Sequence, residues 1–209
     1  MHPSLAQRIE HTLLAPDAPP AAYLRLVEEA EQAELLGVCV PSRWVSRVRP
    51  WWPGLLVSVV GFPLAGVRPE VRALEAKLAI EDGADELDMV ADLARLVEGA
   101  NDAVQEDVER LVELGKPVKV ILETGLVGRA QWTCGAKLAV RAGAAFVKTC
   151  TGFGRGRAEV EDVAELRSVV GPSMGIKASG GIRSRADAQA LVAAGADRLG
   201  TSRGPELLL

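Results

Sequence analysis

The feature that most constrains the fold is a regular alternation of short apolar runs with longer segments of helical pattern. Runs of this kind, bounded by turn residues, are typical of strands in a parallel sheet. Eight of them occur, at residues 8–14, 37–41, 55–62, 84–90, 118–124, 145–149, 175–179 and 197–201. We therefore expect eight strands joined mostly by helices.

Five connecting segments carry the start and stop signals of helices. They span residues 19–37, 69–83, 131–143, 159–171 and 184–195. In the last of these, Ser184 is followed three positions later by Asp187, which is the pattern of a helix capping box. Only the link around Trp51 and Trp52 lacks a clear helical pattern, and these tryptophans fit a core position or an exposed interface equally well.

Eight parallel strands can form an open doubly wound sheet or a closed barrel. Eight nearly regular repeats within 209 residues favour the barrel. No linker or low-complexity tract marks a boundary, so we expect residues 1–209 to form a single-domain α/β fold, a (β/α)8 TIM barrel. In such barrels the catalytic residues lie at the ends of strands and in the loops that follow them.

The composition argues against several classes of function. A net charge of -4 gives no basic surface for nucleic acid, and the longest weakly polar stretch, residues 54–67, contains a proline and is too short to span a bilayer. Cys39, Cys134 and Cys150 are odd in number and lack close spacing, which is typical of free thiols in a reducing cytoplasm. The N-terminus has no pattern of a secretory signal. His2 and His11 show no zinc-type spacing, so we expect no metal.

Charged residues inside the strand runs are the first candidates for a site. Lys119, Lys148 and Lys177 lie in three successive runs, and Asp88 lies in the run before them. Neighbouring strands are about 4.8 Å apart, so the four side chains would lie side by side. A strand-end lysine can reach back to water, and an ion-paired ladder can merely fill a barrel. A buried ion-paired ladder rarely stabilises a folded protein more than an apolar filling would. We therefore favour a catalytic site over a purely structural role for these residues.

Two glycine-rich segments follow the last two strand runs, at residues 179–183 (SGGIR) and 199–204 (LGTSRG). Glycines let backbone N–H groups approach an anion, and the loops after strands 7 and 8 are a frequent phosphate site in these barrels. A glycine-rich segment often serves only to reverse the chain direction. Two such segments in this particular pair of loops nevertheless favour phosphate recognition. The TGFGRG segment at residues 151–156 lacks the G-x-G-x-x-G spacing, so we expect no dinucleotide cofactor there.

Taken in order, these motifs resemble the deoxyribose-phosphate aldolase family over nearly the whole chain. The matching segments are IEHTLL (9–14), VVGFPLAG (59–66), GADELDMV (83–90), VKVILETG (118–125), GAAFVKTCTGFG (143–154), IKASGGIR (176–183) and LGTSRG (199–204). The resemblance implies a class I aldolase that reversibly cleaves 2-deoxy-D-ribose 5-phosphate to acetaldehyde and D-glyceraldehyde 3-phosphate. It also implies a lysine Schiff base, and no metal or cofactor.

The resemblance assigns roles to individual residues. Lys148 is implied as the Schiff-base nucleophile, Lys177 as the second active-site lysine and Asp88 as the proton shuttle. The charge of Lys177 would favour the neutral form of Lys148, which nucleophilic attack requires. The implied phosphate-binding residues are Gly152, Gly180, Gly181, Gly200 and Ser202. Supporting positions are Lys119, Thr12 and Cys39.

Three residues depart from the family's motifs: Glu10 replaces an aspartate, Cys150 a serine, and Arg203 a small polar residue. None of them alters the two lysines or Asp88, so we expect them to bear on rate and substrate preference. Two other functions stay open, namely a Schiff-base aldolase for another phosphorylated sugar and a sugar-phosphate-binding protein that has lost catalysis. We expect a small phosphorylated sugar as ligand, a homodimer or homotetramer as the assembly, and a cytoplasmic location.

Overall fold

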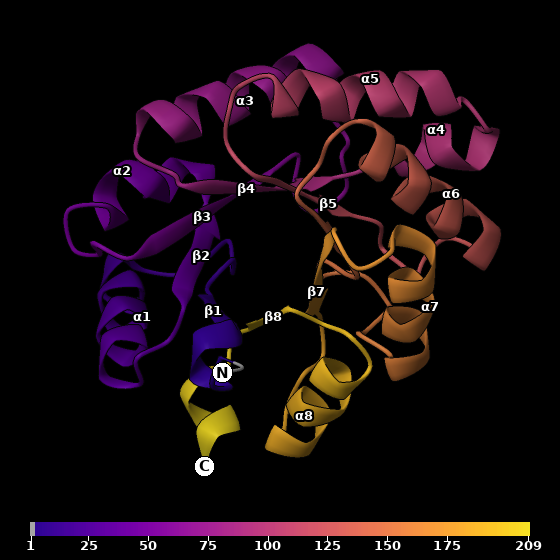
Figure 1. Ribbon diagram of the computed structural model, residues 1–209. Helices are drawn as coiled ribbons and strands as arrows, with labels where there is room; N and C mark the ends of the chain where they lie inside the picture. The colour runs from indigo at the N-terminus through magenta and orange to yellow at the C-terminus, as the bar shows by residue number, and fades with distance from the viewer. Residues whose placement is uncertain (1–2) are drawn as a thin grey trace.

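The computed structural model describes residues 3–209 and contains a closed barrel of eight parallel strands. The strands pair in chain order, and β8 pairs with β1 to close the ring (Figure 1). They are β1 (Ile9–Thr12), β2 (Gly37–Pro41), β3 (Leu55–Val60), β4 (Glu86–Val90), β5 (Val118–Ile121), β6 (Phe146–Lys148), β7 (Gly175–Ser179) and β8 (Arg198–Thr201). Each lies inside one of the predicted runs. The barrel is confirmed, and the open sheet is excluded because β1 and β8 are hydrogen-bonded.

Helices surround the strands on the outside (Figure 1). They are α1 (Pro20–Gln32), α2 (Val45–Val48), α3 (Pro69–Glu81), α4 (Leu93–Glu98), α5 (Asn101–Val112), α6 (Arg129–Arg141), α7 (Val160–Val170) and α8 (Arg185–Ala193), with 3-10 helices η1 (Ala6–Arg8), η2 (Ser42–Trp44) and η3 (Pro205–Leu208). The five predicted helices are confirmed. The predicted capping box is also present, because the Ser184 hydroxyl accepts a hydrogen bond from Asp187 N–H and the Asp187 carboxylate accepts one from Ser184 N–H.

The crossover from β2 to β3 is the irregular one, as the sequence indicated. It holds only η2 and the four-residue α2. Trp52 is buried, and its indole N–H donates to the Leu55 carbonyl at 2.9 Å. Trp51 is 38% exposed. The two tryptophans therefore divide between the core and the surface.

Side chains alternate along β4 between the inside and the outside of the barrel. Leu87 and Met89 belong to the large apolar core that the barrel shares with its surrounding helices. Glu86 and Asp88, which alternate with them along the strand, are also buried but point to the other face of the sheet, into the barrel interior. Within residues 3–209, no helix is long and apolar enough to cross a membrane.

Candidate active site

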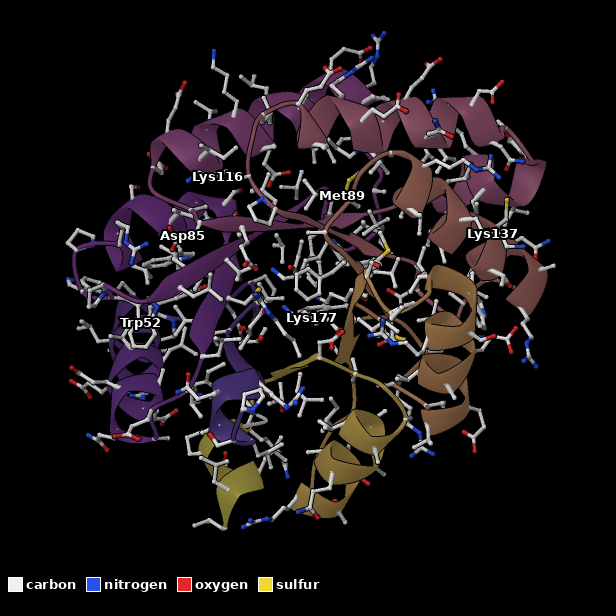
Figure 2. The ribbon with its side chains drawn as sticks, in the orientation of Figure 1. Trp52, Asp85, Met89, Lys116, Lys137 and Lys177 are labelled. Carbon is white, nitrogen blue, oxygen red and sulfur yellow. The ribbon has the colours of Figure 1, made fainter. Side chains whose placement is uncertain are left out.

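The strand register brings together the three strand lysines and Asp88. Asp88 of β4 pairs with Lys119 of β5, and Lys148 of β6 pairs with Lys177 of β7. The exposed fraction is 2% for Lys148 and 0% for the other three. Figure 2 shows Lys177 near the centre of the strand ring, whereas Lys137 lies on α6 outside it. The predicted lateral cluster is therefore present in the folded chain.

Asp88 holds this cluster together. Its Oδ2 atom accepts hydrogen bonds from Lys148 Nζ and from Lys177 Nζ, each at 2.7 Å, and its Oδ1 atom lies 3.0 Å from Lys119 Nζ. Desolvation alone would raise the pKa of Asp88, but the three ammonium groups outweigh it and hold the pKa well below the usual carboxyl range. Asp88 is therefore ionised at neutral pH.

Glu10, one of the departures from the family motif, belongs to the same cluster. It is fully buried on β1 and contacts Lys177 Nζ through Oε2. Its Oε1 atom lies 3.1 Å from Arg198 Nη1 and 3.7 Å from Lys119 Nζ. Burial opposes the charge, but Lys119 and Lys177 lower the pKa of Glu10 overall. The sequence predicted an effect of Glu10 on rate and substrate preference, but not its contact with Lys177.

Two further charged residues of the barrel interior were not predicted. Arg198 of β8 binds both carboxylate oxygens of Glu86, at 2.5 and 3.1 Å, and its guanidinium lies over the Phe146 ring. Glu86 also lies 2.5 Å from Lys119 Nζ. The signal was available, because Glu86 and Asp88 are two positions apart in a strand and so share one face.

Lys148 stands apart from the other two interior lysines. Lys119 forms ion pairs with three carboxylates and Lys177 with two. Among the described residues, the only carboxylate that forms an ion pair with Lys148 is that of Asp88. Desolvation opposes the charge of Lys177, but Asp88 and Glu10 outweigh it and raise the pKa of Lys177 above the usual lysine range. The pKa of Lys119 is raised for the same reason. Lys177 and Lys119 are thus fixed as cations.

A cavity of about 560 Å³ extends from Lys148 to the loops after β6, β7 and β8. Of the three interior lysines, only Lys148 lines it within residues 3–209. The five predicted phosphate-binding residues all line this cavity, namely Gly152, Gly180, Gly181, Gly200 and Ser202. The fold therefore places the candidate nucleophile and the candidate phosphate loops around one space.

Two of these glycines are required by the backbone or by close packing. Gly200 leaves room for Lys177, because a Cβ atom at this position would lie 2.9 Å from Lys177 Cε. Gly181 has a φ of +72°, and a Cβ atom there would lie 2.8 Å from the Cβ of Arg157. A side chain at Gly181 would therefore strain the loop even without an anion.

Two arginines add positive charge to the same cavity. Arg183 follows the glycine pair after β7, and Arg203 lies in the loop after β8. Both are exposed. The backbone N–H of Arg203 donates to Thr201 Oγ1 at 3.0 Å, which fixes the start of its loop. The departure at Arg203 therefore places a cation on the wall of the cavity.

The supporting positions differ in their relation to the cavity. Thr12 lines it, and the Thr12 hydroxyl donates to the Glu10 carbonyl at 2.9 Å. Lys119 lies in the charged cluster. Cys39 does not line the cavity that the structure describes; it packs with Val57 and Val59 inside the barrel. Burial raises the pKa of the Cys39 thiol to about 11.

Glu123 ties the loop after β5 to the loop after β6. It has a left-handed φ of +50° and is 2% exposed. Its Oε2 atom accepts a hydrogen bond from Thr151 N–H at 3.1 Å, and the neighbouring Thr124 N–H donates to the Thr149 carbonyl at 3.2 Å. No pattern along the chain indicates this contact, because it joins residues 28 apart. It fixes the segment that carries Gly152 to the cavity.

Comparisons with known proteins identify relatives of this chain and of its fold. No model of a protein family matches the chain. A deoxyribose-phosphate aldolase of Streptococcus gordonii is 45% identical over 209 residues, covering 98% of this chain and 95% of the relative. A solved structure described as a unique tetrameric deoxyribose phosphate aldolase from Aeropyrum pernix is 37% identical, with a TM-score of 0.89 over 98% of this chain and 89% of the other. A second solved structure, described as "QR15, an Aldolase", is 30% identical, with a TM-score of 0.94 over 97% and 93% of the two chains.

Proposed function

The chain belongs to the deoxyribose-phosphate aldolase family and is an aldolase, and on that premise we propose its reaction and mechanism. The reaction is the reversible cleavage of 2-deoxy-D-ribose 5-phosphate to acetaldehyde and D-glyceraldehyde 3-phosphate. Membership of a family of lyases favours this over a sugar-phosphate-binding protein without catalysis.

One observation carries the assignment of the nucleophile. Lys148 lines the cavity and contacts a single carboxylate, whereas Lys119 and Lys177 are held by two or more carboxylates beneath it. An amine with one ion-pair partner loses its proton at a lower cost than an amine with several. Lys148 is therefore the lysine that both reaches substrate and becomes neutral.

Imine formation begins when Asp88 or a water molecule takes a proton from Lys148. The neutral amine attacks C1 of the open-chain sugar aldehyde and forms a carbinolamine. The same proton then returns to the carbinolamine hydroxyl, which leaves as water. The product is a protonated imine, so the charge of Lys148 is conserved through the step. The 2.7 Å contact between Lys148 Nζ and Asp88 Oδ2 supports this shuttle.

Cleavage then breaks the bond between C2 and C3 of the sugar. A base, Asp88 directly or through water, removes the proton of the C3 hydroxyl. The bond electrons move into the protonated imine and give an enamine, while D-glyceraldehyde 3-phosphate leaves. Protonation of the enamine at C2 and hydrolysis of the resulting imine release acetaldehyde and restore Lys148. Lys177 stays protonated throughout and stabilises Asp88 whenever Asp88 is ionised.

The phosphate of the substrate binds at the far end of the cavity from Lys148. Backbone N–H groups near Gly180, Gly181 and Gly200, the Ser202 side chain and the loop at Gly152 would surround it. Arg183 and Arg203 supply charge from the same walls. A phosphate at this place holds the C1 aldehyde of the open-chain sugar towards Lys148.

The expected homodimer or homotetramer and the cytoplasmic location stay predictions. A relative at 37% identity is described as tetrameric, which is compatible with self-association of this chain.

The test is reductive trapping followed by peptide mapping. Borohydride treatment with acetaldehyde should add an ethyl group to one lysine, Lys148, and abolish turnover of deoxyribose 5-phosphate. Lys148→Met should prevent both trapping and turnover, whereas Lys137→Met, at an exposed lysine of α6, should change neither. An adduct on Lys177 in the wild type would reverse the assignment. Faster turnover of another phosphorylated sugar would change the substrate and leave the mechanism in place.

A further inference from the structure

The ion pairs inside the barrel join into one network that carries more cations than carboxylates. Within residues 3–209 its members are four cations and three carboxylates, namely Lys119, Lys148, Lys177 and Arg198 with Glu10, Glu86 and Asp88. When every group is ionised, one positive charge in this buried network has no counterpart. An uncompensated charge inside a protein is costly, so the network is balanced only when one cation has lost its proton.

One of the four cations can lose a proton more readily than the others. A guanidinium group stays charged in proteins. Desolvation opposes the charge of Arg198, but Glu86 and Glu10 outweigh it and raise its pKa. Lys119 and Lys177, whose pKa values are also raised, are each held by several carboxylates. The balanced state is therefore the one in which Lys148 is neutral, and imine formation requires this state.

Arg198 supplies the extra positive charge without touching the substrate space. Its Nη1 atom lies 3.1 Å from Glu10 Oε1, and its guanidinium binds both oxygens of Glu86 and lies 4.6 Å from the centre of the Phe146 ring. Its side chain is 19% exposed. It does not line the cavity that the structure describes. Any influence of Arg198 on the reaction therefore passes through the charged network.

We propose that Arg198 is a positioning residue of the aldolase reaction, whose permanent charge makes the cations of the network outnumber its carboxylates and so favours loss of a proton from Lys148. The proposal rests on the role of Lys148 as nucleophile proposed above. Removal of Arg198 would leave three cations and three carboxylates, which balance with Lys148 still protonated. Removal of the Glu86 charge would have the opposite effect.

The other groups around Lys148 do not alter this balance. Burial raises the pKa of Cys39 on β2 to about 11, so its thiol is neutral at neutral pH. From β3 the apolar Val57 and Val59 pack against Cys39. Glu123, in the loop after β5, accepts a hydrogen bond from the backbone of the loop after β6. The charged side chains on the cavity wall, which solvent screens, are the exposed Arg183 and Arg203.

The test is the pH dependence of kcat/KM for deoxyribose 5-phosphate, which reports ionisations of the free enzyme. Arg198 and Glu86 each lie two strands from Lys148, roughly 10 Å away. A unit charge at that distance changes a protonation equilibrium about tenfold at an effective dielectric constant of about 20. Arg198→Met should therefore move the acid limb of the profile about one pH unit upwards and slow the reaction about tenfold at neutral pH. Glu86→Gln should move the limb about one unit downwards, and the double variant should return close to the wild type.

Arg167→Met is the matched control. Arg167 is 25% exposed and contacts Asp197, which does not belong to the network. This variant should leave the profile where it is. A second measurement needs no turnover: trace labelling with acetic anhydride, which acetylates only neutral amines, followed by peptide mapping at each pH. Acetylation of Lys148 should shift in the same directions as the kinetic profile. Circular dichroism reports whether each variant is folded, and if Arg198→Met is not, Glu86→Gln alone still tests the direction of the shift.

The outcomes separate this proposal from the proposed function. An unchanged acid limb and unchanged acetylation of Lys148 in folded Arg198→Met would overturn the proposal. Shifts of Arg198→Met and Glu86→Gln in the same direction would do so too, because they would indicate a disturbed structure and not a charge effect. If acetylation of Lys148 shifts as expected while the kinetic profile stays fixed, the charge balance holds and Lys148 is not the nucleophile, which overturns the proposed function.

Discussion

Replacing Lys177 by methionine tests the division of labour between the two site lysines. The substitution keeps an unbranched side chain and removes one positive charge. Lys177 Nζ and Lys148 Nζ each lie 2.7 Å from Asp88 Oδ2, so the two ammonium groups are close neighbours across one carboxylate oxygen. In the proposed mechanism Lys148 must lose a proton before attack, and loss of this neighbouring charge makes that deprotonation harder.

The size of the effect follows from the geometry. Two nitrogens at 2.7 Å from one oxygen are separated by at most about 5.4 Å, where two unit charges repel by about 3 kcal/mol at an effective dielectric constant of about 20. An energy of this size corresponds to about a hundredfold in a protonation equilibrium. We therefore expect Lys177→Met to turn over deoxyribose 5-phosphate about a hundredfold more slowly at neutral pH and to recover part of the loss in alkaline buffer.

The assay is the pH dependence of kcat between neutral and alkaline pH, with release of D-glyceraldehyde 3-phosphate coupled to NADH oxidation. Lys137→Met serves as the control, because it removes an exposed lysine of α6. Borohydride trapping on Lys148 should persist in Lys177→Met after long incubation. Thermal unfolding must accompany the kinetics, since Glu10 and Asp88 each lose a partner.

Two results would refute this reasoning. A rate within about threefold of the wild type at neutral pH would show that the charge of Lys177 does not act on Lys148. A loss that is equal at every pH would show instead that Lys177 transfers a proton in the reaction. In that case the raised pKa of Lys177 would belong to a proton donor and not to a fixed charge.

Four further outcomes follow from the site. Activity should survive exhaustive treatment with EDTA, because the proposed imine would supply the electron sink; inhibition that zinc reverses would contradict the mechanism. Arg203→Ser should raise KM for deoxyribose 5-phosphate about three- to tenfold and leave KM for deoxyribose unchanged, since an exposed charge contact contributes about 1 kcal/mol; equal changes for both sugars would remove the phosphate role. At pH 8 iodoacetamide should label the partly exposed Cys134 and spare Cys39, whose pKa is raised by burial to about 11; rapid labelling of Cys39 would show that the barrel opens. The free energy of unfolding should fall as the pH drops below about 4, because Glu10 and Asp88 have lower pKa values in the folded chain than in the unfolded chain. Urea denaturation at several pH values measures this free energy. A profile that does not change with pH would mean that the two carboxylates are not held ionised.

The sequence predicted the barrel because its information is local and repeated. Each strand is a short apolar run, and each of five helices has its own start and stop residues, such as the capping box at Ser184. Eight such units leave few ways to close a parallel sheet. The lateral order of Asp88, Lys119, Lys148 and Lys177 followed as well, since consecutive strands are neighbours in a barrel.

The partners of those lysines were decided only by the tertiary structure. Glu10 is separated from Lys177 by 167 positions and meets it because β8, the strand between them, carries Gly200, which leaves the space open. Arg198 and Glu86 meet across the barrel interior, 112 positions apart. Patterns along a chain report which side of a strand a residue occupies, but contacts across the interior depend on closure of the ring and on the volume of each side chain. For this reason the sequence predicted which charged residues lie on neighbouring strands. Only the fold determined that Lys177 and Lys119 are each held by several carboxylates, whereas Lys148 lines the cavity and contacts one carboxylate, that of Asp88.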